Sequence, residues 1–147
     1  MALQARPGIM EIAPYVGGEA EIPGMERVLR LASNENALGP SPRAIEAYRE
    51  LSDSLHRYPD GGATALRKAI ADTLGLAADR IVCGAGSDEL ISLLTRAYAG
   101  PGDEVLYSRH GFLMYPISAK GVGAKPVAVP ERDLTADVDA LLAAVTE

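Results

Sequence analysis

The sequence predicts an α/β fold in which parallel strands alternate with helices. From residue 80 onward, short runs typical of strands alternate with longer runs of helical periodicity, which is the pattern of βαβ units. A glycine turn, Gly84-Ala85-Gly86, lies between the first short run and the helical run after it. The composition fits a globular core, because 48% of the 147 residues are apolar and 23% are charged.

The beginning of the chain is predicted to be an arm. Residues 1–41 contain several glycines and prolines and no long periodic segment, so we expect them to be extended and to pack on another part of the protein. Residues 42–147 are expected to form the second region. The predicted domain boundary therefore follows residue 41.

Two helices are predicted next. Ser41 and Pro42 offer an N-cap and a proline at the first helical position, which predicts a helix from Pro42 to about Leu55. The residues 58–62, Tyr-Pro-Asp-Gly-Gly, predict a turn. A second helix is predicted where apolar residues recur on one stripe before a glycine stop: Leu66, Ile70, Leu74 and Gly75.

Three strands and three helices are predicted in the rest of the chain, with three parallel strands as the core. In chain order they are strand 80–83, helix 87–98, strand 104–107, helix 113–120, strand 125–129 and a helix from Val138 to Val145. No strand follows the last helix. We therefore expect an incomplete sheet.

Charge and composition narrow the function. The net charge is −6 and the basic residues are scattered, which disfavours nucleic acid or a membrane surface as partner and favours small metabolites. The N-terminus lacks an apolar signal core, and no stretch approaches the roughly 20 apolar residues of a membrane span, so we expect a cytoplasmic protein. The single cysteine, Cys83, is predicted to be a buried strand residue. His56 and His110 have no neighbouring ligand cluster, so we assign no metal and give neither a special role.

The segment from Gly84 to Glu89 predicts an anion site. A helix start leaves backbone N–H groups unpaired and carries a partial positive charge, so Gly86, Ser87 and Asp88 could hold a phosphate, with the Ser87 hydroxyl as a further donor. Glu89 stands where a dinucleotide fingerprint needs a third glycine, and no Gly-Lys pair closes the turn as in a P-loop. A single phosphate monoester remains as the ligand. An ordinary strand-to-helix turn is the alternative.

Six separated segments along nearly the whole chain point to one family. They are Arg6-Pro-Gly-Ile, Ala13-Pro-Tyr-Val, Leu31-Ala-Ser-Asn-Glu-Asn-Ala-Leu-Gly-Pro40, Tyr58-Pro-Asp-Gly, Gly84-Ala-Gly-Ser-Asp-Glu89 and His110-Gly-Phe-Leu-Met-Tyr115. In this order they resemble the histidinol-phosphate aminotransferases, which are class I/II aminotransferases of fold type I. The family often has proline where Ala37 stands, a difference that touches no chemistry.

The resemblance implies a fold and a cofactor. It implies the first part of a large domain with three α/β/α layers and a mostly parallel sheet, preceded by the arm and two helices. It implies pyridoxal 5'-phosphate at Gly86, Ser87 and Asp88, with Phe112 stacked on the cofactor ring. The alternative for Phe112 is an ordinary core side chain.

The resemblance also implies residues around the substrate. Tyr58 would reach the cofactor phosphate of the neighbouring subunit in a homodimer, and Tyr15 and Asn36, the latter in the turn Asn34-Glu35-Asn36, would form the substrate side of the site. The alternatives are an ordinary turn residue for Tyr58 and an ordinary loop for the asparagine turn.

The implied reaction is amino transfer from histidinol phosphate to 2-oxoglutarate, giving imidazole acetol phosphate and glutamate in histidine biosynthesis; aromatic amino acids are the alternative donors. It needs a Schiff-base lysine and usually an aspartate at the pyridine nitrogen, and neither can be identified in this chain. Lys68, Lys120 and Lys125 are predicted to be solvated surface charges.

The resemblance places the missing lysine and aspartate segments beyond residue 147. We therefore expect the chain to be the front part of such an enzyme, inactive and aggregation-prone by itself because its first strand lacks a neighbour. The alternative is a non-catalytic product that acts at most as a phosphate-binding or subunit-interaction module.

Overall fold

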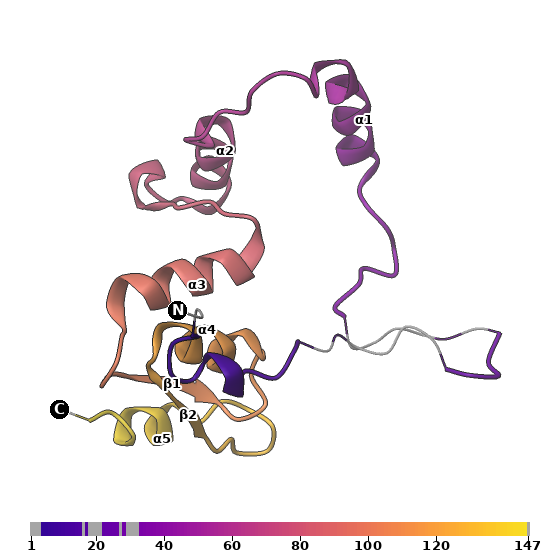
Figure 1. Cartoon of the computed structure of the whole chain (residues 1–147). Helices are drawn as coiled ribbons and strands as arrows, with labels where there is room; N and C mark the ends of the chain where they lie inside the picture. The colour runs from indigo at the N-terminus through magenta and orange to yellow at the C-terminus, as the bar shows by residue number, and fades with distance from the viewer. Residues whose placement is uncertain (1–3, 16, 18–21, 27, 29–32, 147) are drawn as a thin grey trace. The chain divides into compact units, whose positions relative to one another are not determined.

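The computed structural model describes the chain except for residues 1–3, 16, 18–21, 27, 29–32 and 147. The chain divides into two units by its internal contacts, and Figure 1 labels the helices and strands of both. One consists of Met1–Tyr15 with Val82–Glu147, and the other of Val16–Ile81. No helix in the described part is long and apolar enough to cross a membrane. The boundary at residue 41 stays a prediction.

The unit Val16–Ile81 contains the two predicted helices, α1 (Pro42–Leu51) and α2 (Thr64–Leu74). The Ser41 hydroxyl accepts the backbone N–H of Ala44 at 3.1 Å, so the predicted N-cap of α1 is confirmed. The α-helix ends at Leu51, earlier than predicted, because the next three residues tighten into a 3₁₀ turn, Ser52–Ser54. Gly75 ends α2 with a φ of 67°, which glycine adopts without strain.

The turn before α2 is organised by one carboxylate. Asp60 Oδ1 accepts the backbone N–H of Gly62 at 2.9 Å, and Oδ2 accepts that of Thr64 at 2.8 Å. These bonds lower the pKa of the Asp60 carboxyl, and the backbone N–H of Thr64 has the largest effect. The predicted turn at 58–62 is present in its second half, where the N–H of Ala63 donates to the carbonyl of Asp60 at 3.0 Å. The Asp60 side chain also satisfies an N–H group that the start of α2 would otherwise leave unpaired.

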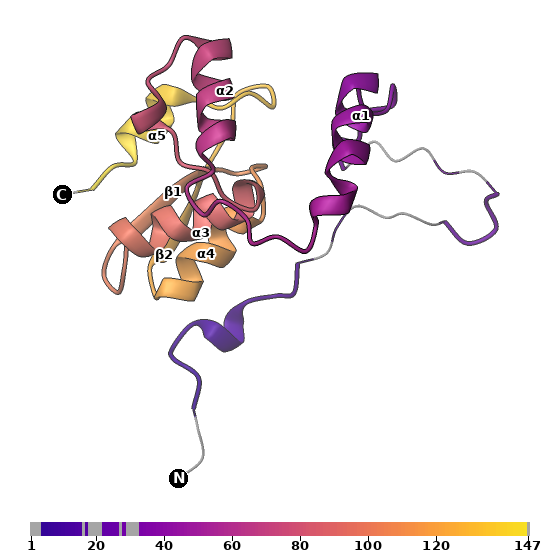
Figure 2. The same cartoon turned by 90° about the horizontal axis from the view of Figure 1, so that it is seen from above.

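The second unit contains the βαβ elements. In chain order they are α3 (Gly86–Tyr98), β1 (Glu104–Ser108), α4 (Met114–Val122), β2 (Lys125–Val129) and α5 (Val138–Ala143). β1 and β2 pair in parallel from Glu104↔Lys125 to Ser108↔Val129. α4 contacts both strands and α3 packs on α4, while α5 contacts β1 from the opposite side of the sheet (Figures 1 and 2).

The arm packs on this unit, as the sequence predicted for its first part. Arg6 donates from Nη2 to the carbonyl of Gly121 at 2.7 Å, and Lys120 donates from Nζ to the carbonyl of Glu11 at 3.2 Å. Gly121 and Lys120 both belong to the last turn of α4. Residues 4–15 are therefore attached to the βαβ unit by its connecting helix.

Pro126 lies in β2 and has no backbone N–H to donate. The N–H of Lys125 points to β1 and donates to the carbonyl of Asp103 at 2.9 Å. Because successive N–H groups alternate in direction along a strand, the nitrogen of Pro126 faces away from β1. The missing N–H therefore costs no hydrogen bond in this pair, and it suits β2 to the edge of a sheet.

The predicted strand at 80–83 is wrong for this structure. Ala78–Arg80 form a 3₁₀ turn and Ile81 is extended, but in the described part of the chain nothing pairs with the segment as a strand. The sheet has two strands instead of three, because strand propensity produces a strand only where a neighbour supplies hydrogen bonds. Val82 is 74% exposed and Cys83 is half-buried, so the predicted burial of Cys83 is also wrong.

The core of the described residues is small. Its buried apolar residues are Ala119, Ala124 and Val129 in the βαβ unit and Ala71 in α2 of the other unit, and no large side chain in the described part is fully buried. Large apolar side chains such as Leu94, Leu142 and Val145 are more than half exposed. These surfaces are consistent with the expectation that other protein segments cover them.

Candidate functional site

The start of α3 has two unpaired donors. The N–H of Gly86 donates to the carbonyl of Gly84 at 2.8 Å, and the N–H of Ala85 donates to Glu89 Oε2 at 2.6 Å. Among the described residues, no acceptor is bound to the backbone N–H groups of Ser87 and Asp88, and the Ser87 hydroxyl lies beside them in the same turn. We call Gly86, Ser87 and Asp88 the anion seat.

Two glycines shape this turn for different reasons. A Cβ at Gly84 would lie 2.8 Å from the Glu89 carboxylate, so Gly84 lets that carboxylate fold back and cap the helix. Gly86 has a φ of 80°, and nothing lies within 4 Å of the position where its Cβ would be. The space beside Gly86 is open, and the seat offers two N–H groups and a hydroxyl, a donor set that fits a phosphate monoester.

The aromatic residues form a second feature. Phe112 is half-buried in the turn before α4, and its ring meets that of Tyr15 edge to face, with centroids 6.0 Å apart and planes at 83°. The ring of Tyr115 also meets that of Phe112 edge to face, with centroids 6.5 Å apart and planes at 85°. The structure therefore brings together two predicted site residues that are 97 positions apart in sequence, one from the arm and one from the turn. Such edge-to-face pairs are favourable for aromatic rings.

Tyr58 and Asn36 lie in the other unit. Tyr58 is 97% exposed. The Asn36 side chain closes a local turn, with Nδ2 donating to the carbonyl of Gly39 at 3.1 Å and Oδ1 accepting the N–H of Leu38 at 3.0 Å. That is the loop role that the sequence left open for this asparagine. The binding roles of Tyr58 and Asn36 stay predictions.

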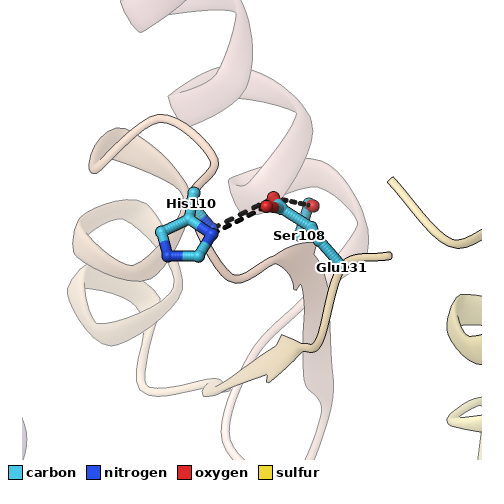
Figure 3. Close-up of polar contacts among 3 residues, drawn as sticks. All are labelled: Ser108, His110 and Glu131. Atoms are coloured by element: carbon cyan, nitrogen blue, oxygen red, sulfur yellow. Dashed lines mark hydrogen bonds and ion pairs between the residues drawn. The ribbon is translucent and has the colours of Figure 1, made fainter. Parts of the chain in front are cut away.

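A polar cluster that the sequence did not predict lies just after β1 and β2 (Figure 3). Glu131 Oε1 accepts hydrogen bonds from the Ser108 hydroxyl and from the backbone N–H of His110, the latter at 3.1 Å. Glu131 Oε2 lies 2.7 Å from His110 Nδ1. The one available signal was that polar residues lie at or within two positions of the ends of two consecutive parallel strands, whose carboxyl ends meet at one edge of the sheet.

The environment of Glu131 keeps it ionised. The hydrogen bond from Ser108 and then those from His110 lower the pKa of the Glu131 carboxyl. A carboxylate only accepts hydrogen bonds, so His110 Nδ1 carries the hydrogen in this pair. The Glu131 side chain is 8% exposed, whereas that of His110 is 64% exposed.

The three lysines have surface partners. Lys68 pairs with Asp72 at 2.5 Å and Lys125 with Glu104 at 2.7 Å, and both lysine side chains are 72% exposed, as predicted. Lys120 differs, because it is half-buried and donates to the arm. Within the described ranges, no group of three or more His, Cys, Asp or Glu side chains could hold a metal ion.

Comparisons with known proteins agree with one family. Residues 26–147 match the family "Aminotransferase class I and II". The chain is 70% identical over 141 residues to the histidinol-phosphate aminotransferase of Paramagnetospirillum magneticum and 66% identical to that of Rhodospirillum centenum, in each case over 96% of this chain and 39% of the relative. It thus spans about two fifths of the length of these relatives.

A solved structure agrees with the sequence comparisons. The crystal structure of histidinol-phosphate aminotransferase from Sinorhizobium meliloti in complex with pyridoxal-5'-phosphate matches with a TM-score of 0.82 and 30% sequence identity. The match covers 97% of this chain and 39% of that one. Sequence and structure together show that the chain belongs to the class I and II aminotransferase family.

Proposed function

We propose that the chain is the front part of a pyridoxal-phosphate-dependent aminotransferase that uses histidinol phosphate as amino donor and 2-oxoglutarate as acceptor. The observation that carries the proposal is the pair of unpaired N–H groups at Ser87 and Asp88, in a chain 70% identical to a histidinol-phosphate aminotransferase. The orphan donors suit the monoester phosphate of this cofactor.

The residues of this chain would bind the cofactor and orient it. The seat would hold the cofactor phosphate, Phe112 would stack on the cofactor ring, and Tyr15, in edge contact with Phe112, would line the substrate side. When bound, the cofactor supplies an electron sink for breaking bonds at the carbon that carries the amino group. Asp88 and Glu89 stabilise the start of α3 through its dipole, but they repel a phosphate dianion, so we expect cationic donors from other segments.

Other parts of the proposal concern the whole protein. A Schiff-base lysine and an aspartate for the pyridine nitrogen would come from outside these 147 residues. We also propose a cytoplasmic homodimer in which Tyr58 reaches the phosphate bound by the partner subunit, and in which Asn36 lies on the substrate side. The 97% exposure of Tyr58 is compatible with such a contact.

The experiment is an assay of the full-length protein with pyridoxal phosphate and 2-oxoglutarate, measuring glutamate formed from histidinol phosphate and, separately, from phenylalanine. We expect the higher kcat/KM with histidinol phosphate. A higher value with phenylalanine would replace the proposed donor by aromatic amino acids. No glutamate from either donor would reject amino transfer.

The alternative function is a non-catalytic phosphate-binding or subunit-interaction module. A labelling experiment on the 147-residue chain distinguishes this alternative from catalysis by the chain. Borohydride reduction in the presence of pyridoxal phosphate labels a lysine that forms a Schiff base. We expect no single lysine to be labelled specifically in this chain, whereas one lysine is labelled in the full-length protein. Specific labelling of Lys68, Lys120 or Lys125 would contradict the proposed division of roles.

A further inference from the structure

One carboxylate ties together the two loops at the carboxyl end of the strand pair. The parallel ladder continues one step beyond β1, where the N–H of Arg109 donates to the carbonyl of Val129 at 2.9 Å. Past that point Glu131, from the β2 side, accepts three hydrogen bonds from Ser108 and His110 on the β1 side (Figure 3). The side chain that makes this connection is 8% exposed.

The segment fixed in this way leads directly to Phe112. The N–H of Gly111 donates to the carbonyl of Ser108 at 2.7 Å, which closes a tight turn. The carbonyl of Phe112 accepts the N–H of Tyr115 at 3.1 Å, where α4 begins. The backbone of Phe112 therefore lies between two fixed points, the carboxylate at His110 and the first turn of α4.

The geometry of the cluster argues against a direct chemical role for its three side chains. The Ser108 hydroxyl donates to the carboxylate and not to the imidazole, so His110 does not activate it as a nucleophile. The Glu131 carboxylate already accepts three hydrogen bonds from protein groups, so it is satisfied without a ligand. The arrangement holds the backbone in place.

We propose that Glu131 is a positioning residue: its carboxylate holds the turn after β1 and thereby sets the place of the Phe112 ring against the cofactor. The effect on the cofactor rests on the proposed function, whereas the holding of the turn does not. A carboxylate suits this task because one side chain can accept the backbone N–H, the imidazole N–H and the hydroxyl together.

Three variants of the full-length protein separate this role from general stability. Glu131→Ala removes all three hydrogen bonds. Glu131→Gln keeps an oxygen for the two donors at Oε1, and its amide group can donate to Nδ1 of the other histidine tautomer, so it should restore the contacts. The matched control is Glu104→Ala, because Glu104 also connects the two strands, through Lys125 at 2.7 Å, but at their amino end.

The first measurement needs no cofactor. Hydrogen exchange at the amides of His110 and Gly111 in the apoprotein should be about 10-fold faster or more in Glu131→Ala, because these amides lose a charged acceptor or the turn that depends on it. Exchange in Glu131→Gln and Glu104→Ala should stay near that of the parent protein. If Glu131→Ala does not fold, Ser108→Ala, which removes one of the three bonds, should show a smaller increase at the same two amides. Unchanged exchange in the folded variants would overturn the proposal.

The second measurement uses bound pyridoxal phosphate. We expect Glu131→Ala to change the visible circular dichroism of the bound cofactor and to lower kcat about 10- to 100-fold, with little change in Glu104→Ala. If Glu131 acts through the ring, Glu131→Ala should add little to Phe112→Ala in a double-mutant cycle. Additive effects, or an unaltered cofactor spectrum in Glu131→Ala, would overturn the link to the cofactor. A parent protein that binds no pyridoxal phosphate would instead reject the proposed function, and the exchange result would still decide whether Glu131 holds the turn.

Discussion

The two ends of the β1–β2 pair each carry a glutamate that connects the strands, but the surroundings differ. At the amino end, Glu104 is 22% exposed and bonds Lys125, whose side chain is 72% exposed. At the carboxyl end, Glu131 is 8% exposed and bonds one backbone and two side-chain donors. An exposed ion pair contributes little to stability, whereas a shielded carboxylate with several donors can hold a loop in one conformation.

The difference follows the general behaviour of parallel sheets. Ligands of α/β folds bind outside the carboxyl ends of the strands, where the loops must have a defined shape. The amino end has no such task, so an exposed pair suffices there. This comparison predicts that changes at the carboxyl end alter the aromatic turn, while similar changes at the amino end alter stability alone.

The largest effect is expected from a substitution that destabilises both ends of the β1–β2 pair at once. Ala119 in α4 is 0% exposed, and α4 contacts both strands. Ala119→Leu forces three extra carbon atoms into this contact and should lower the free energy of unfolding by about 3 kcal/mol. Thermal or denaturant unfolding measures it. Ala97→Leu makes the same change at an exposed position of α3 and should cost little; an equal loss in both variants would mean that Ala119 does not hold the unit together.

The next largest effect comes from glycine substitutions, one at each end of the β1–β2 pair. A Cβ at Gly111 would lie 2.8 Å from the carbonyl oxygen of Ser108, so Gly111→Ala must displace the turn at the carboxyl end, at a cost of about 1 to 2 kcal/mol. At Gly100, before β1, the nearest atom to a Cβ is Asp103 Oδ2 at 4.0 Å. Gly100→Ala should therefore leave unfolding unchanged, and faster exchange at His110 should appear in the Gly111 variant only.

A smaller effect comes from acid. Hydrogen bonds from Ser108 and His110 lower the pKa of Glu131, and the bond from Lys125 lowers that of Glu104. A carboxyl group whose pKa is lower in the folded state stabilises the protein above its unfolded pKa, here about 4.5, and this contribution disappears as the pH falls through the lowered folded pKa. The melting temperature should decrease over that range, and the Glu131→Gln variant should lack the part due to Glu131. A decrease of the same size in both proteins would assign the acid response to other groups.

The smallest effect concerns salt. The Glu104 and Lys125 pair is solvated and should be screened by added salt, whereas the Glu131 contacts are short and shielded. Raising the salt concentration should reduce the difference in melting temperature between the parent protein and Glu104→Ala, but it should hardly change the difference between the parent and Glu131→Ala. Equal salt dependence at both ends would remove the distinction drawn between them.

Local patterns predicted most of the elements. Ser41 and Gly75 mark helix ends through capping groups and backbone conformation that depend on neighbouring residues only, and both positions agree with the structure. The strand at 125–129 was predicted with its observed bounds, Lys125–Val129, because Val127 and Val129 favour a strand. The sequence also predicted a glycine turn leading into a helix, and α3 begins at Gly86, whereas the phosphate role of this turn stays a prediction.

Contacts between distant segments could not be predicted from local sequence patterns. Residues 80–83 have the composition of a strand, yet they form none here, because a strand depends on a neighbour. His110 appeared to need no role until the fold placed Glu131, 21 residues later, beside it. The sequence by itself thus determined most of the helices and strands, the glycine turn for which we propose phosphate binding, and the family, because these depend on local patterns and motifs. The tertiary structure decided which strands pair and which polar side chains meet after them, because strand register and packing bring distant residues within hydrogen-bonding distance.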